Sequence, residues 1–130
     1  MSSAGHHSRI PVCLLVEDNP IERAQITRLW NRSERKAVLI SVPTLAEARR
    51  LLKENQVNLV LLDNSLPDGL GAEFALEISN RKGPAIAILS EWPTPFMFAK
   101  AERAGVLDVL RKNGLSAEQL GHLWDRAQAG

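Results

Sequence analysis

The sequence predicts an α/β fold: a doubly wound, five-stranded parallel sheet with five helices on its two faces. Two observations support this prediction. Five short apolar runs recur along the chain, and amphipathic stretches with helical spacing separate them. Apolar runs without in-and-out alternation are typical of strands buried on both faces, as in parallel sheets. Right-handed crossovers then place the helices on both sides of the sheet.

The predicted strands are short and mainly apolar. They are five or six residues long and consist mostly of Val, Leu, Ile and Ala, although the last contains Asp108. Runs of this length favour strands over helices. The strands are expected at residues 12–16, 37–42, 57–62, 85–89 and 106–110.

Amphipathic stretches separate these strands and follow the last one. The clearest places Leu120, Leu123, Trp124 and Ala127 at spacings 0, 3, 4 and 7, on one face of a helix. Four earlier stretches have similar faces, which gives five helices. These faces are Ile26, Leu29 and Trp30; Leu45, Ala48 and Leu52; Phe74, Ala75 and Ile78; and Met97, Ala101 and Ala104.

Residues at the ends of these stretches agree with the helices. Asn19, followed by a proline, is a good N-cap, and so is Ser116. Thr44 with a glutamate three residues later forms a capping-box pattern. Gly83 and Gly105 are expected just past helix ends, in the left-handed conformation.

The composition fits one globular domain. The chain has 130 residues, of which 45% are hydrophobic, and a formal net charge of +1. This charge gives no general attraction to nucleic acid or to a membrane surface, and no apolar run approaches the roughly 18 residues of a membrane span. The single cysteine, Cys13, excludes an internal disulfide framework. We expect a cytoplasmic protein with a flexible leader at residues 1–9 and one domain at residues 10–128.

Chemically active residues follow four of the predicted strands. Glu17 and Asp18 follow the first, Asp63 the third, Ser90 the fourth and Lys112 the fifth. Ligands of such folds bind at the carboxyl ends of the strands, so these side chains are expected to converge. No glycine-rich phosphate-binding fingerprint is present, which disfavours a nucleotide cofactor.

Three carboxylates at one edge of a sheet would repel one another and favour a bound cation. All of them are hard oxygen donors, which select Mg²⁺ or Mn²⁺ over zinc. The hydroxyl of Ser90 and the ammonium of Lys112 could bind two phosphoryl oxygens, and one carboxylate could act as the nucleophile. The set predicts phosphorylation of a carboxylate, assisted by a divalent cation.

These motifs jointly resemble those of a known family. The motifs are Val16-Glu17-Asp18-Asn19-Pro20, Leu62-Asp63, Leu66-Pro67-Asp68-Gly69, Gly71, Ser90 and the stretch from Ala104-Gly105 to Lys112. In this order they resemble the receiver domain of bacterial two-component response regulators. The resemblance extends over residues 10–127 and implies a flavodoxin-like topology.

The resemblance implies a role for each site residue. Asp63 would be the phosphoacceptor, and it would bind Mg²⁺ together with Glu17, Asp18 and the backbone carbonyl of Ser65. Ser90 would be the switch hydroxyl that binds the phosphoryl group, and Lys112 would pair with that group.

The resemblance also implies the partners. A sensor histidine kinase or a histidine phosphotransfer protein would donate the phosphoryl group. The chemistry would be self-phosphorylation and self-dephosphorylation, without turnover of a separate substrate. Nothing after Trp124 suggests a nucleic-acid-binding segment, so output is expected through protein contacts.

Three residues depart from the family pattern. Val109 stands where receivers usually have a Tyr or Phe, and the chain has no tyrosine, so the usual aromatic rotamer switch is excluded. Glu91 places a carboxylate next to Ser90, where a small residue is usual and where it would repel a phosphoryl group. Asn113 replaces the usual proline after the lysine.

Trp92, Phe96 and Phe98 cluster around the start of the fourth helix. They predict a surface for a downstream protein or for a second copy of the chain, whereas packing of a subset into the core is the alternative. Trp92 could also shield an acyl phosphate from water.

Two other functions remain open. The departures at Glu91, Val109 and Asn113 would also fit an unphosphorylated pseudo-receiver that acts as a dimerisation or adaptor module. A Mg²⁺-dependent phosphatase with an aspartyl nucleophile is the second, but such enzymes usually have a second Asp two residues later, where this chain has Ser65.

Overall fold

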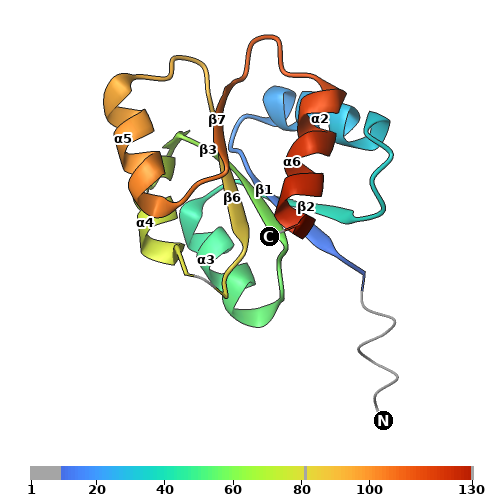
Figure 1. Cartoon of the computed structure of the whole chain (residues 1–130), viewed down its shortest axis with the longest axis horizontal. Coiled ribbons are helices and arrows are strands. Elements are labelled where there is room, and N and C mark those ends of the chain that lie inside the picture. The colour runs from blue at the N-terminus through green and yellow to red at the C-terminus, as the bar shows by residue number, and fades with distance from the viewer. Residues whose placement is uncertain (1–9, 81, 130) are drawn as a thin grey trace.

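A computed structural model describes residues 10–80 and 82–129 of the chain, so the leader expected at residues 1–9 lies outside the described residues. A five-stranded parallel sheet forms the centre of the fold (Figure 1), in the order β2-β1-β3-β6-β7. The predicted fold class is therefore confirmed. The strands are β1 (Val12–Val16), β2 (Val38–Val42), β3 (Leu59–Asp63), β6 (Ala85–Ser90) and β7 (Asp108–Arg111).

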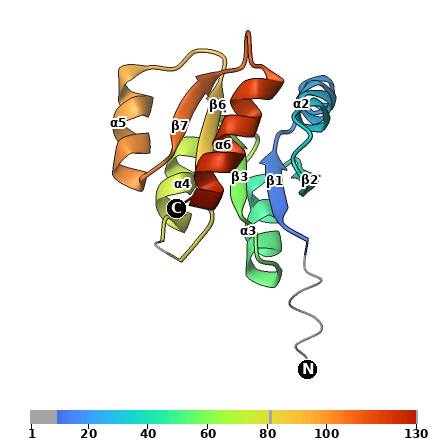
Figure 2. The same cartoon turned by 45° about the vertical axis from the view of Figure 1, so that its right-hand side comes forward.

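Five helices cover the two faces of the sheet, as predicted. One pair lies on one face and the other three lie on the opposite face, which is clearest in the rotated view (Figure 2). The pair is α2 (Pro20–Arg32) and α6 (Ala117–Ala129), and the three are α3 (Leu45–Glu54), α4 (Gly71–Ile78) and α5 (Pro95–Ala104).

The core has two halves, because successive strand residues point to opposite faces of the sheet. In β1, Leu14 packs toward the three-helix face, whereas Cys13 and Leu15 pack toward α2 and α6. On that second face the rings of Trp30 and Trp124 meet edge to face at 5.6 Å. Helices on both faces thus bury the central strands.

The helix caps mostly agree with the sequence-based expectations. Asn19 Oδ1 accepts the first N–H groups of α2, and Thr44 Oγ1 accepts an N–H of α3. Ser116 and Gln119 bind each other's backbone N–H groups ahead of α6. Gly105 ends α5 with a φ of 71°, in the left-handed region.

The expectation for Gly83 is wrong. Helix α4 ends at Ile78 and its C-cap, Ser79, is extended, so the helix stops several residues before this glycine. Gly83 is also absent from the glycines that have positive φ among the described residues.

Strand boundaries differ most at one edge of the sheet and beside Asp63. Strand β7 begins at Asp108, inside the predicted run, and is only partly buried because it has a single neighbouring strand. A short antiparallel hairpin, β4 (Ser65–Leu66) and β5 (Gly69–Leu70), directly follows β3. Its two-residue strands flank the turn at Pro67 and Asp68, which the sequence indicated only as a turn.

Among residues 10–80 and 82–129, no helix is both long enough and apolar enough to cross a bilayer.

Candidate functional site

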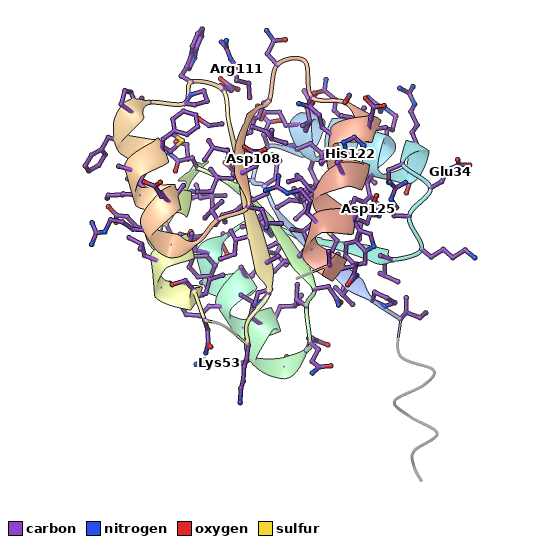
Figure 3. The ribbon with its side chains drawn as sticks, in the orientation of Figure 1. Glu34, Lys53, Asp108, Arg111, His122 and Asp125 are labelled. Carbon is purple, nitrogen blue, oxygen red and sulfur yellow. The ribbon has the colours of Figure 1, made fainter. Side chains whose placement is uncertain are left out.

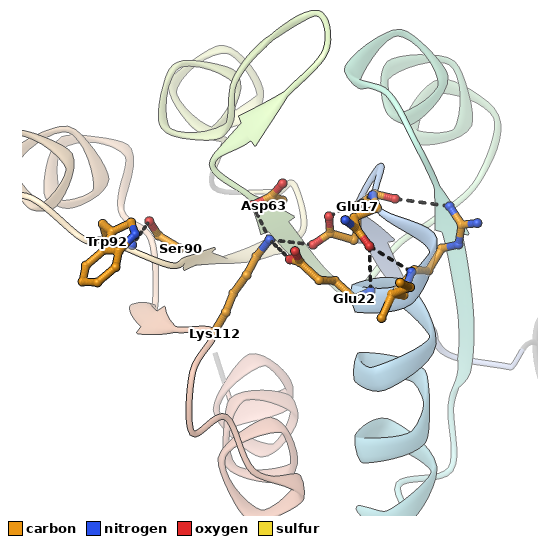
Figure 4. Close-up of polar contacts among 9 residues, drawn as sticks. Glu17, Glu22, Asp63, Ser90, Trp92 and Lys112 are labelled. Atoms are coloured by element: carbon orange, nitrogen blue, oxygen red, sulfur yellow. Dashed lines mark hydrogen bonds and ion pairs between the residues drawn. The ribbon is translucent and has the colours of Figure 1, made fainter.

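The carboxyl ends of β1, β3, β6 and β7 surround a cavity of about 490 Å³ (Figure 4). The register of the sheet aligns these ends, because Asp63 pairs with Leu89 and Ser90 pairs with Arg111. The cavity is lined by residues that follow these strands, including every site residue expected from the sequence. They are Glu17, Asp18, Asn19, Glu22, Asp63, Asn64, Ser65, Ser90, Glu91, Trp92, Thr94, Met97 and Lys112.

Three carboxylates lie together at the base of this cavity. Oxygen atoms of Glu17, Asp18 and Asp63 all lie within 4.8 Å of one another. Glu17 is 1% exposed and Asp63 is 5% exposed, whereas Asp18 lies at the surface. Such a group combines two buried acids with one that solvent reaches.

Lys112 extends from the end of β7 into this group (Figure 4). Its Nζ lies 2.8 Å from Asp63 Oδ1, 2.8 Å from Glu17 Oε1 and 2.5 Å from Glu22 Oε1. Only the contact with Glu22 also has the alignment of a side-chain hydrogen bond. One ammonium is therefore shared among three carboxylates.

Burial and charge shift the pKa values of this cluster. Burial raises the pKa of Asp63, and the opposing effect of Lys112 does not offset it. Burial also raises the pKa of Glu17, against a lowering effect of Lys112 and with a further increase from the charge of Asp63. Burial opposes the charged form of Lys112 too, but its contacts with Asp63, Glu17 and Glu22 outweigh burial and raise its pKa. The pKa values of the two buried acids and of the lysine can all be raised, because three carboxylates share one ammonium.

The residues present fit a divalent cation of the Mg²⁺ type. All available donors are oxygens, which such cations prefer. The buried Glu17 Oε1 has no aligned hydrogen bond among the described residues, although Lys112 Nζ lies 2.8 Å away. The backbone N–H of Ser65 donates to Asp63, and Ser65 itself lies at the wall of the cavity. A cation held by Glu17, Asp18, Asp63 and the carbonyl of Ser65 would supply the missing positive charge.

Ser90 lies in the same cavity, but it is turned toward the loop after β6. Its Oγ accepts the backbone N–H of Trp92 at 3.2 Å (Figure 4). The hydroxyl proton remains available to another acceptor. Ser90 is buried, at 6% exposure, and it lines the cavity.

The segment behind Asp63 is tightly packed against the start of α4. Gly71 N donates to Asn64 O at 2.8 Å, and Ala72 N donates to Asn64 Oδ1 at 3.1 Å. A Cβ atom at Gly71 would lie only 2.4 Å from the carbonyl oxygen of Asp63. The glycine therefore allows α4 to begin against the peptide that follows Asp63.

Glu22 is a site residue that the sequence reasoning missed. It lies in the first turn of α2, where an acid is normally explained by the positive end of the helix. The available signal was its position one turn after the acidic pair, on the helix that begins at the site.

A second, larger cavity of about 640 Å³ adjoins the first. Glu22, Glu91, Trp92 and Lys112 line both cavities. The second is bounded by α2 and by the loop after β7, and its basic residues include Arg28, Arg32 and Arg111.

The aromatic cluster lies at the surface, so the alternative of core packing is wrong. Trp92 is 74% exposed, Phe96 67% and Phe98 48%. The guanidinium of Arg111 lies 5.7 Å from the centre of the Trp92 ring. Arg111 lies at the end of the molecule formed by the loops after β6 and β7 (Figure 3).

Comparisons with known structures agree with this fold. A signal receiver domain of an HD domain-containing protein from Pseudomonas fluorescens Pf-5 superposes with a TM-score of 0.82 and 22% identity, covering 93% of this chain and 96% of that one. A two component response regulator from Cytophaga hutchinsonii gives 0.80 and 22%, covering 94% and 99%. A CheY-like receiver domain protein from Methanospirillum hungatei JF-1 gives 0.76 and 17%, covering 93% and 98%.

A comparison with curated protein sequences finds no match. The family model of the response regulator receiver domain matches residues 13–123, which is most of the chain. Members of this family generally accept a phosphoryl group, bind Mg²⁺ at an acidic pocket and interact with kinases or phosphotransfer proteins. The chain belongs to the response regulator receiver domain family.

Proposed function

We propose that the chain is a phosphoacceptor receiver domain that takes a phosphoryl group on Asp63 in the presence of Mg²⁺. One observation carries the proposal: the Asp63 carboxylate lies in an open cavity, within 4.8 Å of two further carboxylates and 2.8 Å from an ammonium. A structural acid would not need this arrangement, because burial next to other acids costs stability.

The chemistry follows from the positions of these groups. A carboxylate oxygen of Asp63 attacks the phosphorus of a phosphohistidine, an O–P bond forms, and the P–N bond breaks with its electron pair passing to the imidazole. Lys112 neutralises charge on the transferred group, and the Ser90 hydroxyl donates to one of its oxygens. A bound Mg²⁺, held by Glu17, Asp18, Asp63 and Ser65, would supply further positive charge to that group. Water later attacks the phosphorus, the P–O bond to Asp63 breaks, and inorganic phosphate leaves as the carboxylate is restored.

The donor would be a sensor histidine kinase or a histidine phosphotransfer protein. The cavity between α2 and the loop after β7 supports this, because it adjoins the acceptor cavity and carries Arg28, Arg32 and Arg111. A donor that covers both cavities would bring acidic side chains against these arginines.

Output would pass through protein contacts in the cytoplasm, without direct binding to nucleic acid. Trp92, Phe96 and Phe98 support a contact surface for a downstream protein or for a second copy of the chain. Exposed aromatic side chains of this kind are frequent anchors of protein interfaces.

The test is phosphorylation of the purified chain by acetyl phosphate with Mg²⁺. We expect intact-mass spectrometry to show a gain of one phosphoryl group that is absent in Asp63→Asn and is lost when Mg²⁺ is chelated. Size measured on the same sample shows whether phosphorylation changes the oligomeric state. A wild type that gains no phosphoryl group would instead support the pseudo-receiver, which the departures at Glu91, Val109 and Asn113 would also fit.

A further inference from the structure

Glu22 holds the same ammonium that the phosphoryl group needs. Its Oε1 makes the shortest of the three carboxylate contacts to Lys112 Nζ, at 2.5 Å, and the one with hydrogen-bond alignment. Lys112 is 12% exposed and Glu22 is 27% exposed, so water only partly screens the pair. A partly desolvated charged hydrogen bond of this kind is stronger than one at an open surface.

The other two partners of Lys112 have further roles in the proposed function, whereas Glu22 does not. Asp63 would carry the phosphoryl group, and Glu17 would contribute to the Mg²⁺ site. Glu22 lies outside the group of carboxylates that could hold a cation among the described residues. Its carboxylate therefore stays available to Lys112 throughout the cycle.

The position of Glu22 is also fixed. Its backbone N–H donates to Asn19 Oδ1 at 3.0 Å, in the capped first turn of α2. The capped first turn therefore holds the backbone from which the Glu22 side chain reaches Lys112. In Figure 4 the Lys112 Nζ lies between Asp63 on one side and Glu22 on the other.

We infer that Glu22 is a positioning residue that competes with the phosphoryl group for Lys112 and so weakens the phosphorylated state. This inference rests on the proposed function. In the resting site Glu22 shares the ammonium with Asp63 and Glu17. When Asp63 carries a phosphoryl group, the new oxygens compete with Glu22 for the N–H groups of this one ammonium. Any weakening of the Glu22 contact is then subtracted from the stability of the phosphorylated form.

The experiment measures the equilibrium affinity of the full chain for beryllofluoride, a stable mimic of the phosphoryl group, by calorimetry at saturating Mg²⁺. Glu22→Gln keeps the shape of the side chain and removes its charge. We expect it to bind beryllofluoride about three- to tenfold more tightly than the wild type, because a neutral acceptor holds an ammonium less strongly.

Glu91→Gln is the matched control. Glu91 lines the same two cavities as Glu22, and it has no ion pair among the described residues. The same loss of charge at Glu91 reports the through-space effect alone. A double-mutant cycle with Lys112→Ala separates competition for the lysine from the through-space effect of charge, because the competition must vanish when the lysine is absent.

Three outcomes decide the inference. A gain in Glu22→Gln that disappears in the Lys112→Ala background, with the Glu91→Gln effect unchanged there, supports it. An affinity in Glu22→Gln that equals the wild type, or a gain that persists without Lys112, overturns it and leaves the proposed function intact. A wild type that binds no beryllofluoride overturns the proposed function as well. A coupling between Glu22 and Lys112 in urea unfolding checks that the pair itself forms in solution.

Discussion

Lys112 reaches Asp63 across an intervening strand. The two side chains form an ion pair of 2.8 Å, yet Lys112 follows β7 and Asp63 ends β3, and β6 lies between these strands in the sheet. The long side chain of the lysine therefore spans the distance across the end of β6. This arrangement places the only ammonium that the described residues bring to the site directly on the expected acceptor.

Replacing Asp63 by Asn should stabilise the metal-free protein at pH 7. Burial and neighbouring acids disfavour the ionised form of Asp63, as its raised pKa indicates. Lys112 keeps Glu17 and Glu22 as partners, so the substitution leaves no unpaired ammonium. We expect the free energy of unfolding to rise by about 1 kcal/mol, or roughly 3–5 °C in Tm for a chain of this size.

The destabilising effect of the Asp63 carboxylate should depend on pH. A carboxyl group whose pKa is raised by folding binds more protons in the folded state than in the unfolded state. Its contribution to stability is therefore present below the ordinary aspartate pKa, about 3.9, and is lost as the pH rises through the folded value. Wild type should lose stability over this interval more steeply than Asp63→Asn. Thermal unfolding in the presence of a chelator, from pH 4 to 8, measures the stability of wild type and of Asp63→Asn. The exposed Asp18→Asn is the control. If stability changes with pH equally in all three proteins, the prediction is wrong.

Replacing Gly71 by Ala should disturb both stability and the site. The new Cβ would lie 2.4 Å from the carbonyl oxygen of Asp63 and 2.9 Å from Asn64 Cα, so the backbone must move. We expect a loss of about 1–3 kcal/mol in the free energy of unfolding and slower labelling by acetyl phosphate.

Gly121→Ala is the matched control for this prediction. The atoms nearest to its Cβ would belong to the guanidinium of Arg35, the closest at 2.8 Å, which is the far end of a flexible side chain. An alanine inside α6 also gains helix propensity, so this variant should be neutral or more stable. If urea unfolding shows the same change in the free energy of unfolding for both variants, the close packing of Gly71 against the Asp63 carbonyl does not contribute to stability.

Most of the fold could be predicted because each strand and helix carries its own local signal. The apolar runs, the helical faces and the caps at Asn19, Thr44 and Ser116 all indicate the same alternation, and strand ends then place Asp63 and Lys112 at one edge. Boundaries were less accurate where tertiary contacts decide them, as at β7.

The contact between Glu22 and Lys112 could not be predicted. Glu22 meets Lys112 across 90 positions of the chain, and an acid in the first turn of a helix gives no sign of such a partner. Gly83 shows the reverse case: a glycine after an amphipathic stretch suggests a helix end, but α4 ends earlier. The amphipathic pattern therefore predicted that α4 exists, but the glycine did not locate its end.

Asp68 should stabilise the protein in a pH-dependent way. Its two carboxylate oxygens accept the N–H groups of Leu45 and Ala46 at 2.9 and 3.0 Å, so the turn after Asp63 caps the start of α3. These N–H groups lower the pKa of Asp68. A carboxyl group with a lowered pKa contributes stability above its unfolded value, and this contribution is lost as the pH falls through the folded value.

The measurement is urea unfolding of wild type, Asp68→Ala and Asp68→Asn at pH 7 and at pH 3. We expect both variants to be less stable than wild type at pH 7, with Asp68→Asn affected less because its amide oxygen still accepts one N–H. The difference should shrink at pH 3, below the ordinary aspartate pKa of about 3.9. A loss of the same size at both pH values would show that the charge is not involved.

Trp92 should report the occupancy of the site by fluorescence. Its backbone N–H donates to Ser90 Oγ, and its exposed ring lies near the guanidinium of Arg111. If Ser90 turns toward a phosphoryl group, this N–H loses its acceptor and the loop must adjust, which moves the ring relative to Arg111.

We expect tryptophan emission to change when Mg²⁺ and beryllofluoride are added together. Trp92→Phe should remove the change, because Trp30 and Trp124 are buried on the α2 and α6 face, and Ser90→Ala should weaken it while calorimetry still detects binding. A change that survives in Trp92→Phe would instead place the response in the core between α2 and α6.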